Sequence, residues 1–326
     1  MQIIQGIENF KHYHRGGICL ALGNFDGVHV GHREILRETI SMAGKIGKKS
    51  AALLFQPHPM SVLSPGKAPE LILEAGDRIR LLGETGIDYV IIHSFTRDFA
   101  ALSPEAFAGE VIADALQACG VVVGYDYSFG KCGRGTPEDL IRFGERFHFT
   151  VKVVDPVTVD GEVAGSTAIR SLLQQGELAR ANKMLGYYYF LRGTVVRGDG
   201  RGRLLGFPTA NLAVAPEVVL PAFGVYLTWV AGRDISGWGI TNVGRRPTFG
   251  KRDITVEIHL LDADKNIYGK ELIVYFLHRL RGEKTFADAG ALAAQIAEDA
   301  GTARKLMAQP PYNALQLPAY APACPY

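Results

Sequence analysis

The chain has 326 residues. Because domains usually have about 100–200 residues, this length predicts two domains. Hydrophobic residues make up 47% and charged residues 21%, as in ordinary globular proteins, and the net charge is +2. Nucleic-acid-binding proteins carry a concentrated basic excess, so we expect no nucleic-acid partner. The N-terminus lacks the apolar core of a secretory signal, and no apolar run reaches about 18 residues. We therefore expect a cytoplasmic protein without membrane contact.

The four cysteines, Cys19, Cys119, Cys132 and Cys324, form neither a C-x-x-C pair nor zinc-ligand spacing. Scattered cysteines of this kind fit a reducing compartment better than a disulfide framework. Cys19 and Cys119 are expected to be small buried apolar residues.

The first half alternates short apolar runs with helical patterns. Strands are expected at residues 18–22, 51–55, 89–92, 121–123 and 151–154. Helices are expected at residues 31–46, 76–82, 104–119 and 138–147. This alternation predicts crossover connections and a parallel sheet, in other words a Rossmann-like α/β domain. Ligands of such sheets bind outside the carboxyl ends of the strands.

After two short helical patterns in residues 167–185, strands follow one another without intervening helices. They are expected at residues 190–196, 225–230, 237–242, 255–261 and 272–276, with a closing helix at about 286–306. Strands in series predict an antiparallel barrel. We place the boundary near Gly186, which gives domains at 1–186 and 187–308. Residues 309–326, rich in Pro and Ala, predict a disordered tail.

The sharpest motif is residues 22–32, Leu-Gly-Asn-Phe-Asp-Gly-Val-His-Val-Gly-His, where a strand runs through a glycine-bearing turn into a helix. Glycines let backbone approach a phosphate closely, and the helix start directs N–H groups at an anion. His29 and His32 are three apart and share a helix face, so both can point at one ligand. Their imidazoles could donate to oxygens that gain charge in phosphoryl chemistry.

The second motif is residues 198–212, Gly-Asp-Gly-Arg-Gly-Arg-Leu-Leu-Gly-Phe-Pro-Thr-Ala-Asn-Leu. Its glycines, with Gly202 and Gly206 as candidates, make a loop whose N–H groups can cradle phosphates. Thr209 and Asn211 are two apart, so they face one side of an extended segment. Their hydroxyl and amide oxygens are hard ligands suited to Mg²⁺.

Residues 23–32 resemble the H-x-G-H signature of nucleotidylyltransferases. Their specific sequence resembles the form that this signature takes in the FAD synthetase module of bacterial riboflavin kinase/FAD synthetases. Further blocks resemble that family at residues 56–59, 95–107, 123–130 and 166–170. The resemblance implies that His29 and His32 contact the phosphates of ATP. It extends the ATP site to the neighbouring residues Gly23, Asn24, Phe25 and Gly31.

The same resemblance implies that Arg170, with Ser166 and Thr167, binds the phosphates that leave as pyrophosphate. Asp126 would lie near the reaction centre. Two positions depart from the family pattern: Gly165 stands where a serine is common, and Gln56 where an acid is usual. His58, between two prolines, fits turn architecture and ligand binding equally well.

Residues 207–212, Phe-Pro-Thr-Ala-Asn-Leu, resemble the signature of riboflavin kinases, and blocks at 224–226, 241–249, 256–262, 268–270 and 274–278 agree. The resemblance implies a six-stranded Greek-key barrel in which Thr209 and Asn211 hold Mg²⁺–ATP. It also implies that Glu257 is the general base. Strand periodicity alone leaves Glu257 either on an exposed face or beside a pocket, since both give the same alternation.

The resemblance in both halves implies one enzyme with two reactions: ATP phosphorylates riboflavin to FMN, and ATP adenylylates FMN to FAD. Riboflavin, FMN and ATP are then the partners, and the chain is expected to be a monomer or weak homo-oligomer. Three alternatives stay open at this point. They are an enzyme that keeps only the kinase, a flavin-binding or nucleotide-binding regulator without catalysis, and a nucleotidylyltransferase for another phosphate.

Overall fold

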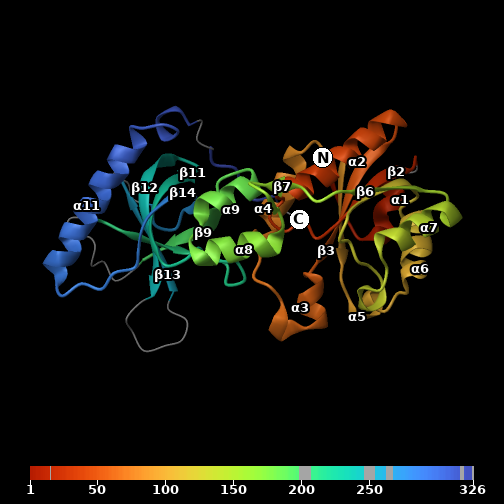
Figure 1. Cartoon of the computed structure of the whole chain (residues 1–326), viewed down its shortest axis with the longest axis horizontal. Helices are drawn as coiled ribbons and strands as arrows, with labels where there is room; N and C mark the ends of the chain where they lie inside the picture. The colour runs from red at the N-terminus through yellow and green to blue at the C-terminus, as the bar shows by residue number, and fades with distance from the viewer. Residues whose placement is uncertain (15, 198–206, 246–253, 262–266, 316–318, 325–326) are drawn as a thin grey trace. The chain divides into compact units, whose positions relative to one another are not determined.

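The computed structural model describes residues 1–14, 16–197, 207–245, 254–261, 267–315 and 319–324. The chain forms two compact units, Met1–Ser166 with Ala323–Tyr326, and Thr167–Pro322 (Figure 1). This division falls earlier in the chain than the boundary that we expected near Gly186. In the described residues no helix is long and apolar enough to cross a membrane.

The first unit is built on a six-stranded sheet in the order β1-β4-β3-β2-β5-β6, and every neighbouring pair is parallel. The expected parallel α/β sheet is confirmed. The strands are β1 (Gln2–Gln5), β2 (Ile18–Leu22), β3 (Lys49–Gln56), β4 (Tyr89–Ser94), β5 (Ala118–Gly124) and β6 (Thr150–Val154). The edge strand β1 was not predicted, because its four residues are too few to show a period.

Helices and short turns connect these strands. They are η1 (Ile7–Asn9), α1 (Phe10–Tyr13), α2 (Val30–Lys45), α3 (Pro59–Leu63), η2 (Pro65–Lys67), α4 (Ala75–Glu84), α5 (Arg97–Ala100), α6 (Pro104–Ala106), η3 (Phe107–Ala115), η4 (Lys131–Gly133) and α7 (Pro137–Phe147), with a hairpin of β7 (Thr158–Val159) and β8 (Glu162–Val163). The helix expected to reach residue 119 instead ends at Ala115. Gln117 takes a left-handed φ of 49°, which turns the chain so that Ala118 starts β5.

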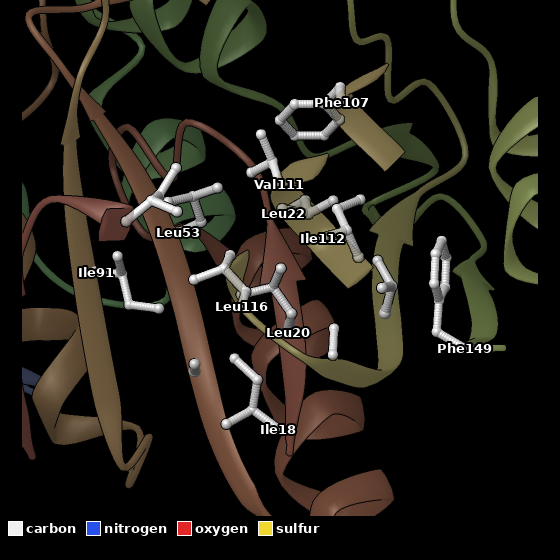
Figure 2. Close-up of a cluster of buried hydrophobic side chains, with 14 of the residues drawn as sticks. Ile18, Leu20, Leu22, Leu53, Ile91, Phe107, Val111, Ile112, Leu116 and Phe149 are labelled. Carbon is white, nitrogen blue, oxygen red and sulfur yellow. The ribbon is translucent and has the colours of Figure 1, made fainter. Parts of the chain in front are cut away.

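The sheet is buried on both faces, which explains why its strands read as continuous apolar runs. Ile18, Leu20 and Leu22 of β2 lie at the centre of one face, opposite Val111, Ile112 and Leu116 (Figure 2). The intervening Cys19 and Ala21 are equally buried and face the other side, where α2 packs on β2, β3 and β5.

All four cysteines are free thiols. Cys19 is fully buried, and this burial, with the nearby Cys119, raises the pKa of its thiol to about 11. The thiol therefore stays protonated and behaves as a small apolar side chain.

The second unit is a closed antiparallel barrel of six strands in the order β10-β13-β12-β11-β14-β9, which confirms the expected barrel. Its elements are α8 (Ser166–Gln175), α9 (Leu178–Leu185), β9 (Phe190–Val196), β10 (Ala210–Ala213), β11 (Gly224–Gly232), β12 (Ile235–Arg245), β13 (Ile254–Leu260), β14 (Glu271–Gly282), α11 (Ala289–Met307) and η5 (Tyr312–Ala314). The short β10 was expected only as an extended segment.

The helix α11 lies along the outside of the barrel beside β12 and β14 (Figure 1). Ala300 and Ala303 of this helix pack on Val225, Leu227 and Ile240. A bidentate ion pair adds to this contact, since Arg281 of β14 donates from Nε to Asp299 Oδ1 and from Nη2 to Oδ2, each at 2.9 Å.

Asp299→Ala is expected to destabilise the barrel by about 3 kcal/mol, because it leaves a largely buried guanidinium without its carboxylate. The side chains of Arg281 and Asp299 are only 15% and 7% exposed. Urea unfolding of the full chain measures the change. Glu298→Ala, at the exposed neighbouring position, is the control and should change stability by less than about 0.5 kcal/mol. Equal effects of the two substitutions would contradict the role of the pair.

The described residues of the segment expected to be a disordered tail make specific contacts. Tyr320 donates from its hydroxyl to Glu271 at 2.8 Å, and the carbonyl of Ala321 accepts from Arg192 at 2.7 Å. In the first unit, the Cys324 N–H donates to the carbonyl of Gly76 at 3.2 Å.

Two candidate active sites

In the first unit the strand order reverses between β2 and β5. The chain runs outward from β2 through β3 to β4, and then returns to place β5 on the other side of β2. At such a switch point the loops after the two strands diverge and leave a crevice at their carboxyl ends. The loop after β2 carries the two histidines, and the loop after β5 carries Asp126.

We call residues 23–29, between β2 and α2, the histidine loop. His29 is the N-cap of α2, and its Nδ1 accepts from the backbone N–H of His32 at 3.3 Å. An accepting Nδ1 leaves the proton of a neutral imidazole on Nε2. The two rings stack at 3.6 Å between centroids, and Phe25 packs edge-on against His32 at 5.3 Å. The sequence-predicted pair is therefore brought together at the start of a helix.

The backbone of the histidine loop is strained. Phe25 and Val28 have φ values of 50° and 36°, a region that side chains disfavour, and Gly27 has φ 85°. Each such non-glycine residue costs on the order of 1–3 kcal/mol and persists only when its surroundings hold it. At Gly31 a side chain would be crowded. A Cβ there would lie 3.2 Å from His29 Cε1 and 3.4 Å from the carbonyl oxygen of Ala164.

Two residues that the sequence did not single out hold this loop. The carboxylate of Asp26, 2% exposed, accepts from Ile72 N–H at 3.0 Å and from Leu73 N–H at 3.3 Å. Arg78 of α4 is 5% exposed and donates from Nη1 to the carbonyl of Asn24 at 3.2 Å. The position of Asp26 inside the motif could have indicated its role in the loop. The sequence gives no such indication for Arg78, because Arg78 lies 54 residues from its acceptor.

Asp126 is exposed in the loop after β5, and its Oδ1 lies 3.3 Å from where a Cβ at Gly124 would be. Gln56 is the last residue of β3, the other neighbour of β2. His58 caps α3, since its Nδ1 accepts from Met60 N–H at 3.2 Å, so it has a role in the turn.

Ser166, which ends the main segment of the first unit and is the first residue of α8, donates from its hydroxyl to the carbonyl of Asp26 at 2.8 Å. Thr167 follows on the same helix, and Arg170 lies four residues after Ser166. Residues four apart share a helix face, so Ser166 and Arg170 point to the same side of α8. Gly165 precedes the helix, and apart from its chain neighbours no heavy atom of the described residues lies within 4 Å of where its Cβ would be.

In the barrel, the strand register places two of the predicted residues, Asn211 and Glu257, in one row. Asn211 of β10 pairs directly with Glu257 of β13. Glu257 pairs in turn with Asn242 of β12, and Asn242 pairs with Val225 of β11. Directly paired side chains project from the same face of a sheet. Val225 packs under α11, so this is the outer face of the barrel. On this face Glu257 lies beside Asn211 and Asn242, and it is partly buried.

Thr209 precedes β10 by one residue and lies two before Asn211, which is 6% exposed. The segment before the strand is fixed by His259, whose Nδ1 bonds the carbonyl oxygen of Pro208 at 2.9 Å. The ring of His259 also packs on Phe207 at 5.6 Å. An amide and a carboxylate thus come from the adjacent strands β10 and β13, and the hydroxyl of Thr209 comes from the residue just before β10. Gly202 and Gly206 lie outside the described residues.

The two sites have the character of a nucleotide-using transferase: a helix start with two imidazoles in one unit, and oxygen ligands beside a carboxylate in the other. Comparison with known families agrees. Residues 11–168 match the family model of FAD synthetase, and residues 185–307 match that of riboflavin kinase.

Among curated proteins, the bifunctional riboflavin kinase/FMN adenylyltransferase of Listeria monocytogenes is 36% identical over 292 residues, covering 89% of this chain and 92% of the relative. The protein of the same name from Escherichia coli K12 is 35% identical over 306 residues, covering 94% and 97%. The chain belongs to the bifunctional riboflavin kinase/FMN adenylyltransferase family.

A solved structure from Streptococcus pneumoniae has the same fold over nearly the whole chain. It is 31% identical with a TM-score of 0.83, and the match covers 93% of this chain and 98% of that one. Its title describes a macrolide-efflux protein. The similarity in fold spans both units, as do the matches to the curated relatives.

Proposed function

We propose that the chain catalyses two consecutive reactions at two separate sites. The barrel transfers the γ-phosphoryl group of ATP to the 5′-hydroxyl of riboflavin and forms FMN. The first unit then transfers the adenylyl group of a second ATP to the FMN phosphate, which forms FAD and releases pyrophosphate. The observation that carries the proposal is the pairing of each site with its own family match: His29 and His32 fall within the FAD synthetase match, and Asn211 and Glu257 within the riboflavin kinase match.

In the barrel, Glu257 takes the proton of the riboflavin hydroxyl as its oxygen attacks the γ-phosphorus. The donor set beside it suits a hard cation, since Thr209 and Asn211 offer neutral oxygens that can hold Mg²⁺ together with ATP phosphates. When bound, Mg²⁺ neutralises charge on those phosphates. The chain's own residues orient the hydroxyl and accept its proton.

In the first unit, the FMN phosphate attacks the α-phosphorus of ATP, so positioning and charge neutralisation supply most of the catalysis. His29 and His32 donate to phosphate oxygens at the start of α2, where the helix dipole adds positive potential. Backbone at Gly23, Asn24, Phe25 and Gly31 lines the nucleotide. Asp126 lies near the reaction centre. The pyrophosphate that leaves is assigned to Ser166, Thr167 and Arg170 in the first turns of α8, as the family resemblance implies.

The test is a product assay on the full chain with riboflavin, ATP and Mg²⁺, with the flavins separated by chromatography. FMN followed by FAD is the expected result. If FMN forms without FAD, only the kinase half of the proposal stands. The absence of both products would overturn the whole proposal. With FMN supplied in place of riboflavin, FAD should form without a lag.

Three further expectations stay proposals. The chain works in the cytoplasm, as a monomer or weak homo-oligomer. The two catalytic halves divide near Gly186, which is supported by family matches that end at residue 168 and begin again at residue 185.

Gly165→Ser is expected to raise kcat/KM for FAD formation. The substitution restores the hydroxyl that the family pattern has at this position, and the space around its Cβ is open. A hydrogen bond to a charged group contributes at least about 1.5 kcal/mol, or about tenfold in rate. Steady-state kinetics with FMN measure the change. Gly165→Ala fills the same space without a hydroxyl and should show no gain; an equal gain in both variants would exclude the hydroxyl as the cause.

A further inference from the structure

The histidine loop is held from one side by a single stretch of chain, the residues from Ile72 to Arg78. The carboxylate of Asp26 accepts from Ile72 N–H at 3.0 Å and 3.1 Å, through its two oxygens, and from Leu73 N–H at 3.3 Å. Arg78 donates to the carbonyl of Asn24 at 3.2 Å. Two residues of the loop are therefore tied to two points of a segment that lies some fifty residues later in the sequence.

These ties are buried. Asp26, Arg78, Ile72 and Leu73 are all no more than 5% exposed. The side chain of Ile72 also fills the space beside Gly27, since a Cβ at Gly27 would lie 2.9 Å from Ile72 Cδ1. In buried surroundings water does not compete for the donor and the acceptor, so a charge-assisted hydrogen bond fixes the geometry of its partners.

The loop needs such ties because its backbone is strained. Phe25 and Val28 hold positive φ values on either side of Asp26 and Gly27. Strained backbone at a functional site persists only when neighbouring structure over-determines it. His29 follows Val28 directly, so a relaxation of the loop would move the imidazole that caps α2 and stacks on His32.

We propose that Asp26 and Arg78 are positioning residues for adenylyl transfer, which act through the histidine loop and do not touch the reacting atoms. This inference rests on the function proposed for the first unit. Asp26 fixes the centre of the loop and Arg78 fixes its beginning. Together they keep His29 and His32 aimed at the phosphates in the strained conformation.

The first test compares Asp26→Ala with Asp26→Asn in the full chain, with FMN and ATP as substrates. Alanine removes both acceptor oxygens, whereas asparagine keeps one for Ile72 N–H. A displacement of catalytic groups by about 1 Å costs about 100-fold in rate, so Asp26→Ala should lower kcat for FAD formation by about that factor. The KM for FMN should change by less than about threefold, because the proposal gives these two buried residues no contact with the flavin phosphate. Asp26→Asn should fall between the alanine variant and the wild type.

The second test removes the other tie. Arg78→Met keeps the bulk of the side chain without the guanidinium and should also lower kcat, whereas Arg78→Lys keeps one donor and should retain more activity. Arg142→Met is the matched control. It removes an arginine of the same unit whose side chain is 73% exposed and pairs with Asp139, and FAD formation should not change.

Amide hydrogen exchange separates positioning from loss of fold. In Asp26→Ala the amides of Ile72 and Leu73 should exchange faster, while those of the core strand β2 keep their protection. If the variants lose FAD formation and the amides of β2 lose their protection as well, the substitutions unfold the unit. Asp26 and Arg78 would then support only the fold, and the proposal would be overturned. Unchanged kcat in both Asp26→Ala and Arg78→Met would also overturn it. If the wild type makes no FAD, the proposed function fails instead, and the exchange pattern still reports whether the ties exist.

Discussion

Glu257→Gln is expected to lower the rate of FMN formation from riboflavin by about 100-fold to 10,000-fold, the range over which a positioned general base contributes. The amide keeps the size of the carboxylate and its place in the row beside Asn211, but it accepts no proton. The riboflavin hydroxyl is a poor nucleophile, so the barrier rises when its proton has no acceptor. Chromatography of the flavins after incubation with riboflavin, ATP and Mg²⁺ measures the loss.

Two controls make the result specific. FAD formation from supplied FMN should be unchanged in Glu257→Gln, because that reaction belongs to the other unit. Glu217→Gln, at an exposed glutamate of the barrel unit, should leave FMN formation intact. If Glu257→Gln abolishes FAD formation from FMN in a folded protein, the assignment of two separate sites is wrong.

His32→Ala is expected to have the opposite effect. It should lower FAD formation from FMN by about 100-fold to 1,000-fold, the loss found when one preorganised donor to developing charge is removed. FMN formation from riboflavin should persist. His32 is a cleaner target than His29, since the imidazole of His29 also caps α2 and its removal would cost about 1 kcal/mol of helix stability.

The matched control is His12→Ala, which removes an exposed histidine of the same unit. Neither reaction should respond to it. The ring contact between Phe25 and His32 gives a check on the fold, because the alanine variant loses that contact and should unfold at a slightly lower temperature. If the His32→Ala variant forms FAD at the wild-type rate, His32 has no catalytic role.

The sequence alone determined the architecture, because that depends on local patterns, and its motifs supplied the candidate site residues. Alternating apolar runs and helical periods are enough to predict a parallel sheet followed by a barrel. His29 and His32 could be paired from their spacing, because three residues along a helix return to the same face. Where local signals were weak, as at β1 and at the end of the helix before β5, the prediction missed an edge strand and extended the helix past Gln117.

Only the tertiary structure decided which distant residues act together. The place of Glu257 beside Asn211 depends on the register between β10 and β13, because hydrogen bonding between strands, and not spacing along the chain, sets which residues are opposite. The roles of Asp26 and Arg78 likewise depend on contacts with residues about fifty positions away. A buried carboxylate and a buried guanidinium look like solvated surface charges in a sequence, and their burial becomes evident only when the segment that covers them is in place.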